Sequence, residues 1–245
     1  MVSVVFVSTD PVWCQFLRTH IPPQLLSVSV QNAKIDSVLH SCSIDRPSAV
    51  VTPANSLGYM GGGFDRSILE CIGSDKNLEH KIQALLAESH RGYLPISSAK
   101  IVDLAHIVQG PRFDFLIPAP SMTVPEPIAP SHAKQHIFDT IWNALVAAKN
   151  APRAISTVII PAFGTNWGQV HPHVSAASTL AATAIFNWPL YDMGPRQSGL
   201  LRSSLALMYL RKDISKFGVP DHIKELEELR QHSQAEPLRE WLCTL

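Results

Sequence analysis

Short apolar runs rich in Val, Ile and Phe alternate along the chain with longer stretches of helical periodicity. Runs of this kind predict β-strands. They cover residues 2–8, 27–30, 48–52, 100–105, 113–117 and 155–161, with 203–210 as a further candidate. Several of these runs are apolar throughout rather than alternating, which is typical of strands buried on both faces of a sheet.

Apolar residues recur every three or four positions in four other segments, and this spacing predicts helices. The segments are residues 75–89, 131–149, 172–186 and 220–231. Asp75, Ser131 and Pro172 suit the starts of the first three helices. The ordinary role of such apolar stripes is core packing.

Strands that alternate with helices predict an α/β fold, with a mixed, largely parallel sheet flanked by helices. No internal repeat is visible. Residues 118–130 hold five prolines and are expected to form a structured loop or an extended crossing, and residues 188–202 are expected to form a second loop. We expect one domain over residues 1–211 and a C-terminal helical extension over residues 212–245.

Composition narrows the classes of partner. The 245 residues are 46% apolar, enough for a core that needs no disulfides. Twenty Lys and Arg balance twenty Asp and Glu, which argues against a duplex nucleic-acid platform that relies on neutralising phosphates. Pro, Asn or Arg interrupts the longer apolar stretches, so neither a transmembrane helix nor a membrane partner is expected.

The cysteines and histidines form no recognised metal motif. Cys14, Cys42, Cys71 and Cys243 stand far apart, and no C-x-x-C pair suggests a zinc ribbon or a redox dithiol. We expect reduced cysteines and a cytoplasmic or nuclear protein. His132 and His136 are four residues apart, but no glutamate completes an H-E-x-x-H motif, so no metal is expected.

The segment with the clearest chemistry is residues 49–69, where a buried strand leads through a glycine-rich loop into a helix. Three consecutive glycines at residues 61–63 leave the backbone bare, and their N–H groups can converge on an anion. The start of the following helix adds to the same site. The pattern predicts a phosphate or diphosphate site, with a tight turn that binds nothing as the alternative.

Two common nucleotide-binding motifs do not fit this loop. No lysine follows the glycines, so the segment is not an ordinary NTPase P-loop. No G-x-G-x-x-G follows a strand, so the dinucleotide-binding fingerprint is absent as well.

Two segments together resemble the macrodomain family, whose members bind ADP-ribose. The string VVTPANS…GGGFD resembles the family signature N-A-A-N…G-G-G-[VI]-D, and VIIPAFGTN…SAAS resembles its P-x-x-G-T-G loop and following helix. Residues 91–124 resemble the branch that includes phage tail-type macrodomains, through an A-P-S-M element. The resemblance covers about residues 1–190 and implies a three-layer α/β/α fold.

The chain departs from the family pattern at three positions. Lys34 stands where the family has an aspartate that reads the adenine amine, and Asp36 follows two residues later as the remaining candidate. Thr52 replaces the first asparagine of the signature. Asn166 replaces the last glycine of G-T-G, and asparagine tolerates a left-handed backbone.

The resemblance implies a role for each matching residue. The implied ligand-binding residues are Gly61, Gly62, Gly63, Phe64, Gly164, Thr165, Asn166, Trp167, Asp36 and His171. Asn55 would fix sugar hydroxyls, and Asp65 would orient or deprotonate a water that attacks the anomeric carbon. Plainer roles stay open: a turn residue for Asn55, a helix-start acid for Asp65, surface positions for His171 and His173, and a loop anchor for Trp167.

The implied ligand is ADP-ribose or a derivative, with no cofactor. The leading hypothesis is hydrolysis at the distal ribose of a mono-ADP-ribosylated protein, O-acetyl-ADP-ribose or ADP-ribose 1″-phosphate. A non-catalytic ADP-ribose reader is the alternative, and a site for another nucleotide or an RNA end is a third possibility. No glutamate pair follows the glycines, so cleavage of poly-ADP-ribose is not expected.

Overall fold

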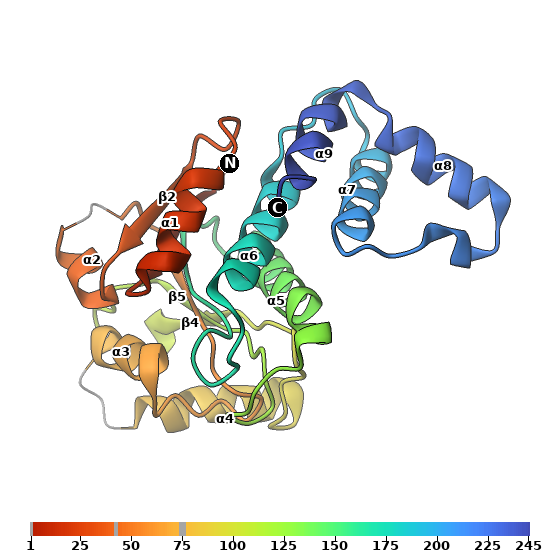
Figure 1. The fold of residues 1–245 in the computed structure, drawn as a ribbon. Helices are drawn as coiled ribbons and strands as arrows, with labels where there is room; N and C mark the ends of the chain where they lie inside the picture. Colours follow the sequence, from red (N-terminus) through yellow and green to blue (C-terminus); the bar gives the residue numbers. More distant parts are fainter. Residues whose placement is uncertain (1, 42–43, 74–76) are drawn as a thin grey trace.

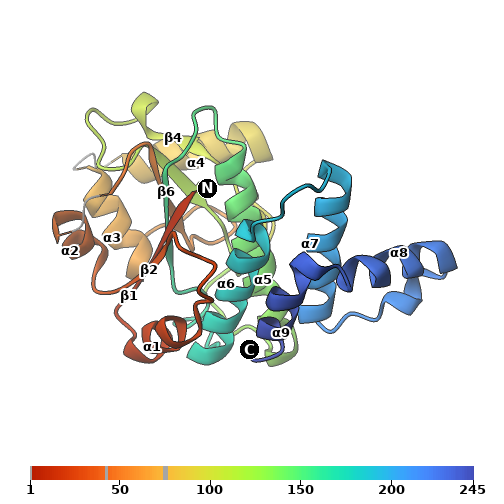
Figure 2. The ribbon, with the colours of Figure 1, turned by 90° about the horizontal axis from the view of Figure 1, so that it is seen from above.

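A computed structural model describes residues 2–41, 44–73 and 77–245. A central sheet of six strands, in the order β2-β1-β6-β3-β5-β4, lies between two layers of helices (Figures 1 and 2). The strands are β1 Ser3–Ser8, β2 Val28–Asn32, β3 Ser48–Thr52, β4 Val102–Asp103, β5 Phe115–Pro118 and β6 Thr157–Pro161. The helices are α1 Pro11–His20, α2 Ile35–Ser41, α3 Gly63–Ile72, α4 Leu78–His90, α5 Pro130–Lys149, α6 Pro172–Asn187, α7 Pro195–Tyr209, α8 Pro220–Arg230 and α9 Glu236–Leu242.

Every strand pair in the sheet is parallel except the pair of β4 with β5 at one edge. Parallel neighbours need crossover connections, and the helices supply them. All residues of β3, β5 and β6 are buried, which explains their uninterrupted apolar sequences. The carboxyl ends of five strands therefore meet at one edge of the sheet.

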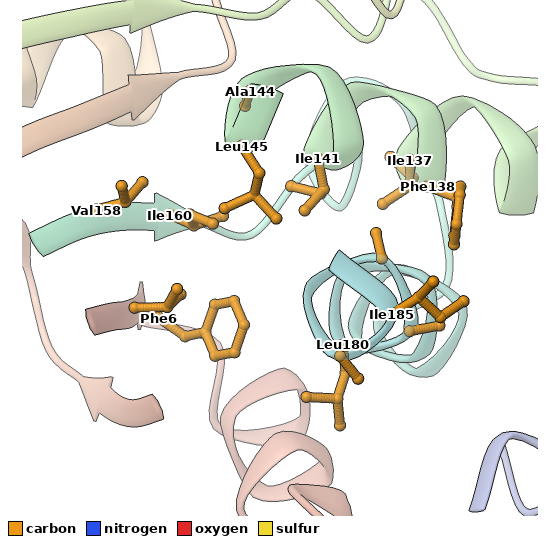
Figure 3. Close-up of a cluster of buried hydrophobic side chains, with 14 of the residues drawn as sticks. Phe6, Ile137, Phe138, Ile141, Ala144, Leu145, Val158, Ile160, Leu180 and Ile185 are labelled. Atoms are coloured by element: carbon orange, nitrogen blue, oxygen red, sulfur yellow. The ribbon is translucent and has the colours of Figure 1, made fainter. Parts of the chain in front are cut away.

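Two hydrophobic layers cover the two faces of the sheet. Helices α1, α5, α6, α7 and α9 contribute to one layer, and α2, α3 and α4 contribute to the other. Figure 3 shows part of the first layer, where Ile141 and Leu145 of α5 and Leu180 of α6 pack with Phe6 and Ile160 of the sheet. Burying each large apolar side chain of this kind contributes about 1.5–3 kcal/mol.

The three C-terminal helices, α7, α8 and α9, first leave the body of the protein and then come back to it. Helices α7 and α8 stand apart from the sheet in both views, whereas α9 comes back to the body of the protein (Figures 1 and 2). Leu238 and Leu242 of α9 join the same buried cluster as α6. Trp241 Nε1 donates a hydrogen bond to the His20 carbonyl at 2.8 Å, which ties α9 to the end of α1.

The structure corrects three expectations about single elements. Residues 203–210 belong to α7 and are not a strand, and the segment expected to be a loop, residues 188–202, contains the start of that helix. Pro195 suits the first turn of α7. Leu201, Leu205 and Tyr209 follow one another at intervals of four residues on the buried face of the helix.

The segment 100–105 forms only the two-residue strand β4. Its chain then turns into a short 3₁₀ helix, Leu104–His106, because the Asp103 side chain accepts a hydrogen bond from the Ala105 amide. The predicted helix over residues 75–89 is present as α4, although Asp75 lies outside the described residues, as does Cys42. Cys14, Cys71 and Cys243 are free cysteines.

Candidate functional site

A pocket of about 400 Å³ opens at the carboxyl edge of the sheet, and we call it the edge pocket. The loops after β1, β2 and β6 and the first turn of α3 line it. The lining residues are 7–10, 33–35, 63–64, 67, 161–162 and 165–166. Its volume suits a small-molecule ligand, and the edge where parallel strands end is where α/β folds bind ligands.

A larger hollow of about 1190 Å³ lies elsewhere, between α3, α4 and residues 107–112. No loop that follows β1, β2, β3 or β6 contributes to it, so the glycine loops do not face it. We therefore take the smaller edge pocket as the candidate site.

The start of α3 supplies unused backbone donors to the edge pocket. Gly62 is the N-cap of α3, and no side chain caps the helix there. The first backbone hydrogen bond of the helix, from the Arg66 amide to the Gly62 carbonyl, is long at 3.4 Å. By contrast, the Asp10 carboxylate caps α1 by accepting from the Val12 and Trp13 amides. The uncapped amides and the helix dipole make the start of α3 the better place for an anion.

The loop after β6 is a tight structure that presents two residues to the edge pocket. Gly164 has a φ of +72°, and its carbonyl accepts from the Val170 amide at 2.9 Å. Thr165 and Asn166 follow and line the pocket. A Cβ built on Gly63 would lie 3.7 Å from the side-chain nitrogen of Asn166, Nδ2, so the two glycine loops meet across the pocket.

The structure brings together several of the residues that the sequence singles out. Gly63, Phe64, Thr165 and Asn166 all line the edge pocket. The residues just before Gly63, Gly61 and Gly62, are exposed, and a Cβ on either would meet nothing within 4 Å. The absence of side chains at Gly61 and Gly62 therefore leaves open space beside the loop. At Gly63 the backbone itself favours glycine, because its φ is +56°.

Asn55 does not line the edge pocket, and its side chain already holds a turn together. Its Oδ1 accepts hydrogen bonds from the Leu57 amide at 3.0 Å and the Tyr59 amide at 3.2 Å. These bonds match the plainer role of a turn residue after Pro53. The Asn55 Nδ2 group is the part of the side-chain amide that could still donate to a sugar hydroxyl, and that role stays a prediction.

Asp65 lies in the first turn of α3 and contacts the end of β3. The Thr52 hydroxyl, which is fully buried, donates to Asp65 Oδ1 at 2.6 Å. Burial raises the pKa of the Asp65 carboxyl to about 7, and the hydrogen bond from Thr52 opposes that shift. Asp65 is therefore divided between its acid and its carboxylate form near neutral pH. Through Thr52, Asp65 lies at the end of β3, the strand next to β6, whose loop lines the edge pocket.

Three further predicted residues lie outside the edge pocket. Asp36, in the first turn of α2, lines a separate hollow. His171 is the N-cap of α6, where its Nδ1 accepts from the His173 amide, so the plainer helix-start role describes its contacts. Trp167 is 61% exposed at the tip of its loop and does not anchor it.

Sequence reasoning missed the contribution of the loop after β1. Asp10 and Lys34 both line the edge pocket, from the first turns that follow β1 and β2. The signal was present in the string Ser8-Thr9-Asp10-Pro11, in which a buried strand runs into an N-cap acid and a helix-start proline. Among the described residues, no group of three His, Cys, Asp or Glu could hold a metal ion, and no helix is long and apolar enough to cross a membrane.

The structure is an α/β fold with a pocket at the carboxyl edge of its sheet. The family model described as the macro-like domain matches residues 1–235, so the chain belongs to that family. This match confirms the predicted macrodomain family, and the six-stranded sheet between two helical layers confirms the predicted fold class.

Solved structures with a similar chain include two of the Oceanobacillus iheyensis macrodomain. An asparagine-to-alanine mutant is 22% identical with a TM-score of 0.47, over 58% of this chain and 68% of its own. The same macrodomain with ADP is 22% identical with a TM-score of 0.45, over 55% of this chain and 66% of its own.

Alanine substitution should affect the stability of the two glycine loops differently. Gly164→Ala should lower the free energy of unfolding by about 1–3 kcal/mol, because the backbone is left-handed there. In addition, the new Cβ would lie 2.9 Å from Val170 Cγ2 and 3.0 Å from Ile137 Cδ1. Gly61→Ala is the matched control and should stay within about 0.5 kcal/mol of the wild type. Urea titration measures both, and equal stabilities would refute a packing role for Gly164.

Proposed function

We propose that this protein binds ADP-ribose, or a derivative of it, along the carboxyl edge of its sheet. The observation that carries the proposal is the uncapped start of α3, which faces Thr165 and Asn166 across the edge pocket. Backbone amides from both sides can hold a diphosphate there without a lysine or arginine. The resemblance to macrodomains implies ADP-ribose as the ligand, and membership of the macro-like domain family supports that ligand here.

The order of the strands gives the bound ligand a direction. Adjacent positions along the edge are the ends of β2, β1, β6 and β3. The diphosphate belongs near β6 and α3, where the glycine loops meet. Towards β1 and β2 the pocket has apolar walls, including Val7 and Ile35, which suit a flat base. The second sugar then extends the other way, towards the end of β3 and the Thr52–Asp65 pair.

Asp10 is our candidate for the residue that reads the base. Its Oδ1 accepts the two capping hydrogen bonds of α1, and among the described residues no hydrogen bond is found at its Oδ2. A carboxylate oxygen in the base end of the pocket can accept from the exocyclic amine of adenine. Lys34, which holds the position of the usual aspartate, has no acceptor for that amine.

Binding should appear as stabilisation. At a hundredfold excess over Kd, ADP-ribose should stabilise the protein by about 2.7 kcal/mol, or about 5–10 °C in Tm for a chain of this size. Gly62→Glu should remove the shift, because it puts a negative charge at the helix start where the diphosphate binds. The fold should survive, since a Cβ on Gly62 meets nothing within 4 Å.

Gly199→Glu provides the matched control for this experiment. Gly199 lies in α7, and a Cβ on it also meets nothing within 4 Å. This variant should keep the full thermal shift. Wild-type protein that shows neither a thermal shift nor calorimetric heat with millimolar ADP-ribose would end the proposal.

Reading of adenine by Asp10 is tested with a substitution that preserves the helix cap. Asn is as good an N-cap as Asp, so Asp10→Asn should leave stability nearly unchanged. It should lower the affinity for ADP-ribose about tenfold, because a charge-assisted hydrogen bond is lost. The inosine analogue, which has a carbonyl in place of the amine, should bind the wild type and Asp10→Asn more equally. Calorimetry with both ligands decides, and an unchanged affinity for ADP-ribose would refute the role.

A second candidate function, hydrolysis at the distal ribose, is favoured by the Thr52–Asp65 pair. A pKa of about 7 suits a general base near neutral pH. In the proposed step a water oxygen bonds to the anomeric carbon, the bond from that carbon to the leaving group breaks, and the proton that Asp65 takes from the water passes to the leaving group. With O-acetyl-ADP-ribose the water bonds to the acyl carbon instead, and the ribose oxygen is the leaving group. The reader function remains the alternative, in which Asp65 only stabilises the start of α3.

The pH profile separates these roles. If Asp65 is the base, turnover of an ADP-ribose derivative should rise with pH through about 7, as the carboxyl ionises. Thr52→Val removes a hydrogen bond that lowers the pKa, so the rise should move to higher pH. Asp65→Asn should reduce kcat about 10²–10⁴-fold with ADP-ribose affinity little changed.

Suitable substrates are a mono-ADP-ribosylated protein, O-acetyl-ADP-ribose and ADP-ribose 1″-phosphate. Binding of ADP-ribose without turnover of any of the three would favour the reader. Full turnover by Asp65→Asn would exclude Asp65 as the base.

A further inference from the structure

A second hollow, of about 370 Å³, opens directly beside the edge pocket, and we call it the flank pocket. It lies between α2 and α3, and Arg112 closes it from the loop before β5. Lys34 and Ser67 line both pockets, so the two cavities share a wall. A ligand in the edge pocket can therefore place a substituent in the flank pocket without leaving its site.

The charged side chains of the flank pocket favour an anion. Lys34 and Arg112 are exposed, and in the described part of the chain neither makes an ion pair. Two acids line the same hollow, Asp36 and Glu70. Glu70 is already paired with Arg66, at 3.1 Å. Because this exposed pair only partly offsets the charge of Glu70, Asp36 and Glu70 both oppose the two cations, and Arg66 adds a third cation beside the hollow.

His40, Ser67 and the buried Cys71 complete the lining. His40 Nδ1 lies 2.6 Å from the Asp36 carbonyl oxygen, which leaves its Nε2 for a ligand. The Ser67 hydroxyl makes a long bond, 3.4 Å, to the Gly63 carbonyl and can turn to a closer acceptor. The set of donors, an arginine fork, an ammonium group, an imidazole and a hydroxyl, matches the needs of a phosphate better than those of a neutral or apolar group.

The flank pocket adjoins the base end of the edge pocket. Lys34 follows β2, at the apolar end where Val7 and Ile35 would contact the base. The diphosphate end, at Gly63 and Asn166, is not part of the flank pocket. Ser67 also joins the two pockets, and its hydroxyl contacts the Gly63 carbonyl, so Lys34 is the shared residue at the base end. A group that enters the flank pocket past Lys34 is attached to the nucleoside, and the ribose hydroxyls of adenosine are points of attachment next to a base.

We propose that the flank pocket binds an additional phosphate carried by the adenosine ribose of the ligand, at its 2′ or 3′ oxygen. This inference rests on the proposed function and names its substrate class: an ADP-ribose phosphorylated at the nucleoside end. Arg112 and Lys34 hold the phosphate, much as an arginine accommodates the 2′-phosphate in dinucleotide-binding α/β folds. Asp36 then opposes the phosphate rather than reading adenine.

Calorimetry with three ligands tests the proposal: ADP-ribose and its forms phosphorylated at the adenosine 2′ or 3′ oxygen. Wild-type protein should bind one or both phosphorylated forms at least about tenfold more tightly than ADP-ribose. Arg112→Ala should abolish that preference and leave the affinity for ADP-ribose itself unchanged, because Arg112 does not line the edge pocket. Lys34→Ala should abolish the preference too, and Asp36→Asn should increase it.

Lys149→Ala provides the matched control. Lys149 is an exposed lysine at the end of α5 and lines neither pocket, so its loss should leave the preference intact. Equal or weaker binding of both phosphorylated forms by the wild type would overturn the proposal, as would a preference that survives in Arg112→Ala. Binding of ADP-ribose without any preference contradicts this inference alone, whereas binding of none of the three ligands contradicts the proposed function as well.

Discussion

The parallel pairing of β2, β1, β6 and β3 is the constraint on which the rest of the site depends. It places the carboxyl ends of four strands side by side, although the residues involved are far apart in the sequence. Asp10, Lys34 and Asn166 come from the loops after β1, β2 and β6, and Thr52 is the last residue of β3. The helices that make the crossovers start at this edge, so their N-termini face the same space. The start of α3 can attract an anion because glycine, which has no side chain to cap it, takes the N-cap position.

The sequence was most informative where a backbone requirement leaves few alternatives. Gly63 and Gly164 were recognisable because a left-handed backbone strongly favours glycine. The buried strands were recognisable because unbroken Val and Ile runs need two covered faces. Helices α1 and α7 were missed for the opposite reason: their buried faces are short or mixed, and tertiary packing decides them. The pairing of loops across the sheet, including that of Asp10 with Lys34, depends on strand order, which no local pattern reveals.

The Thr52–Asp65 pair shows two opposing influences on one carboxyl group. Burial favours the neutral acid, and the short hydrogen bond from Thr52 favours the carboxylate. Because burial dominates, the pKa is about 7, and the group can exchange a proton near neutral pH at little cost. A helix-start acid that served only stability would gain more by staying ionised next to the helix dipole. The raised pKa is thus unfavourable for α3, and raised carboxyl pKa values of this kind gather at functional sites.

The two ends of the proposed ligand would be recognised by different physics. Neutral amides of α3 and the loop after β6 would hold the diphosphate, and the backbone fixes their dipoles, so a chain without net charge could still bind a dianion. Any ligand with a diphosphate satisfies that part equally. Selectivity must therefore come from the ends, where side chains vary: Asp10, Lys34 and Arg112 at the nucleoside, and Asp65 at the second sugar. Lys34 and Arg112 are exposed charges, so salt should weaken their contribution more than that of the amides.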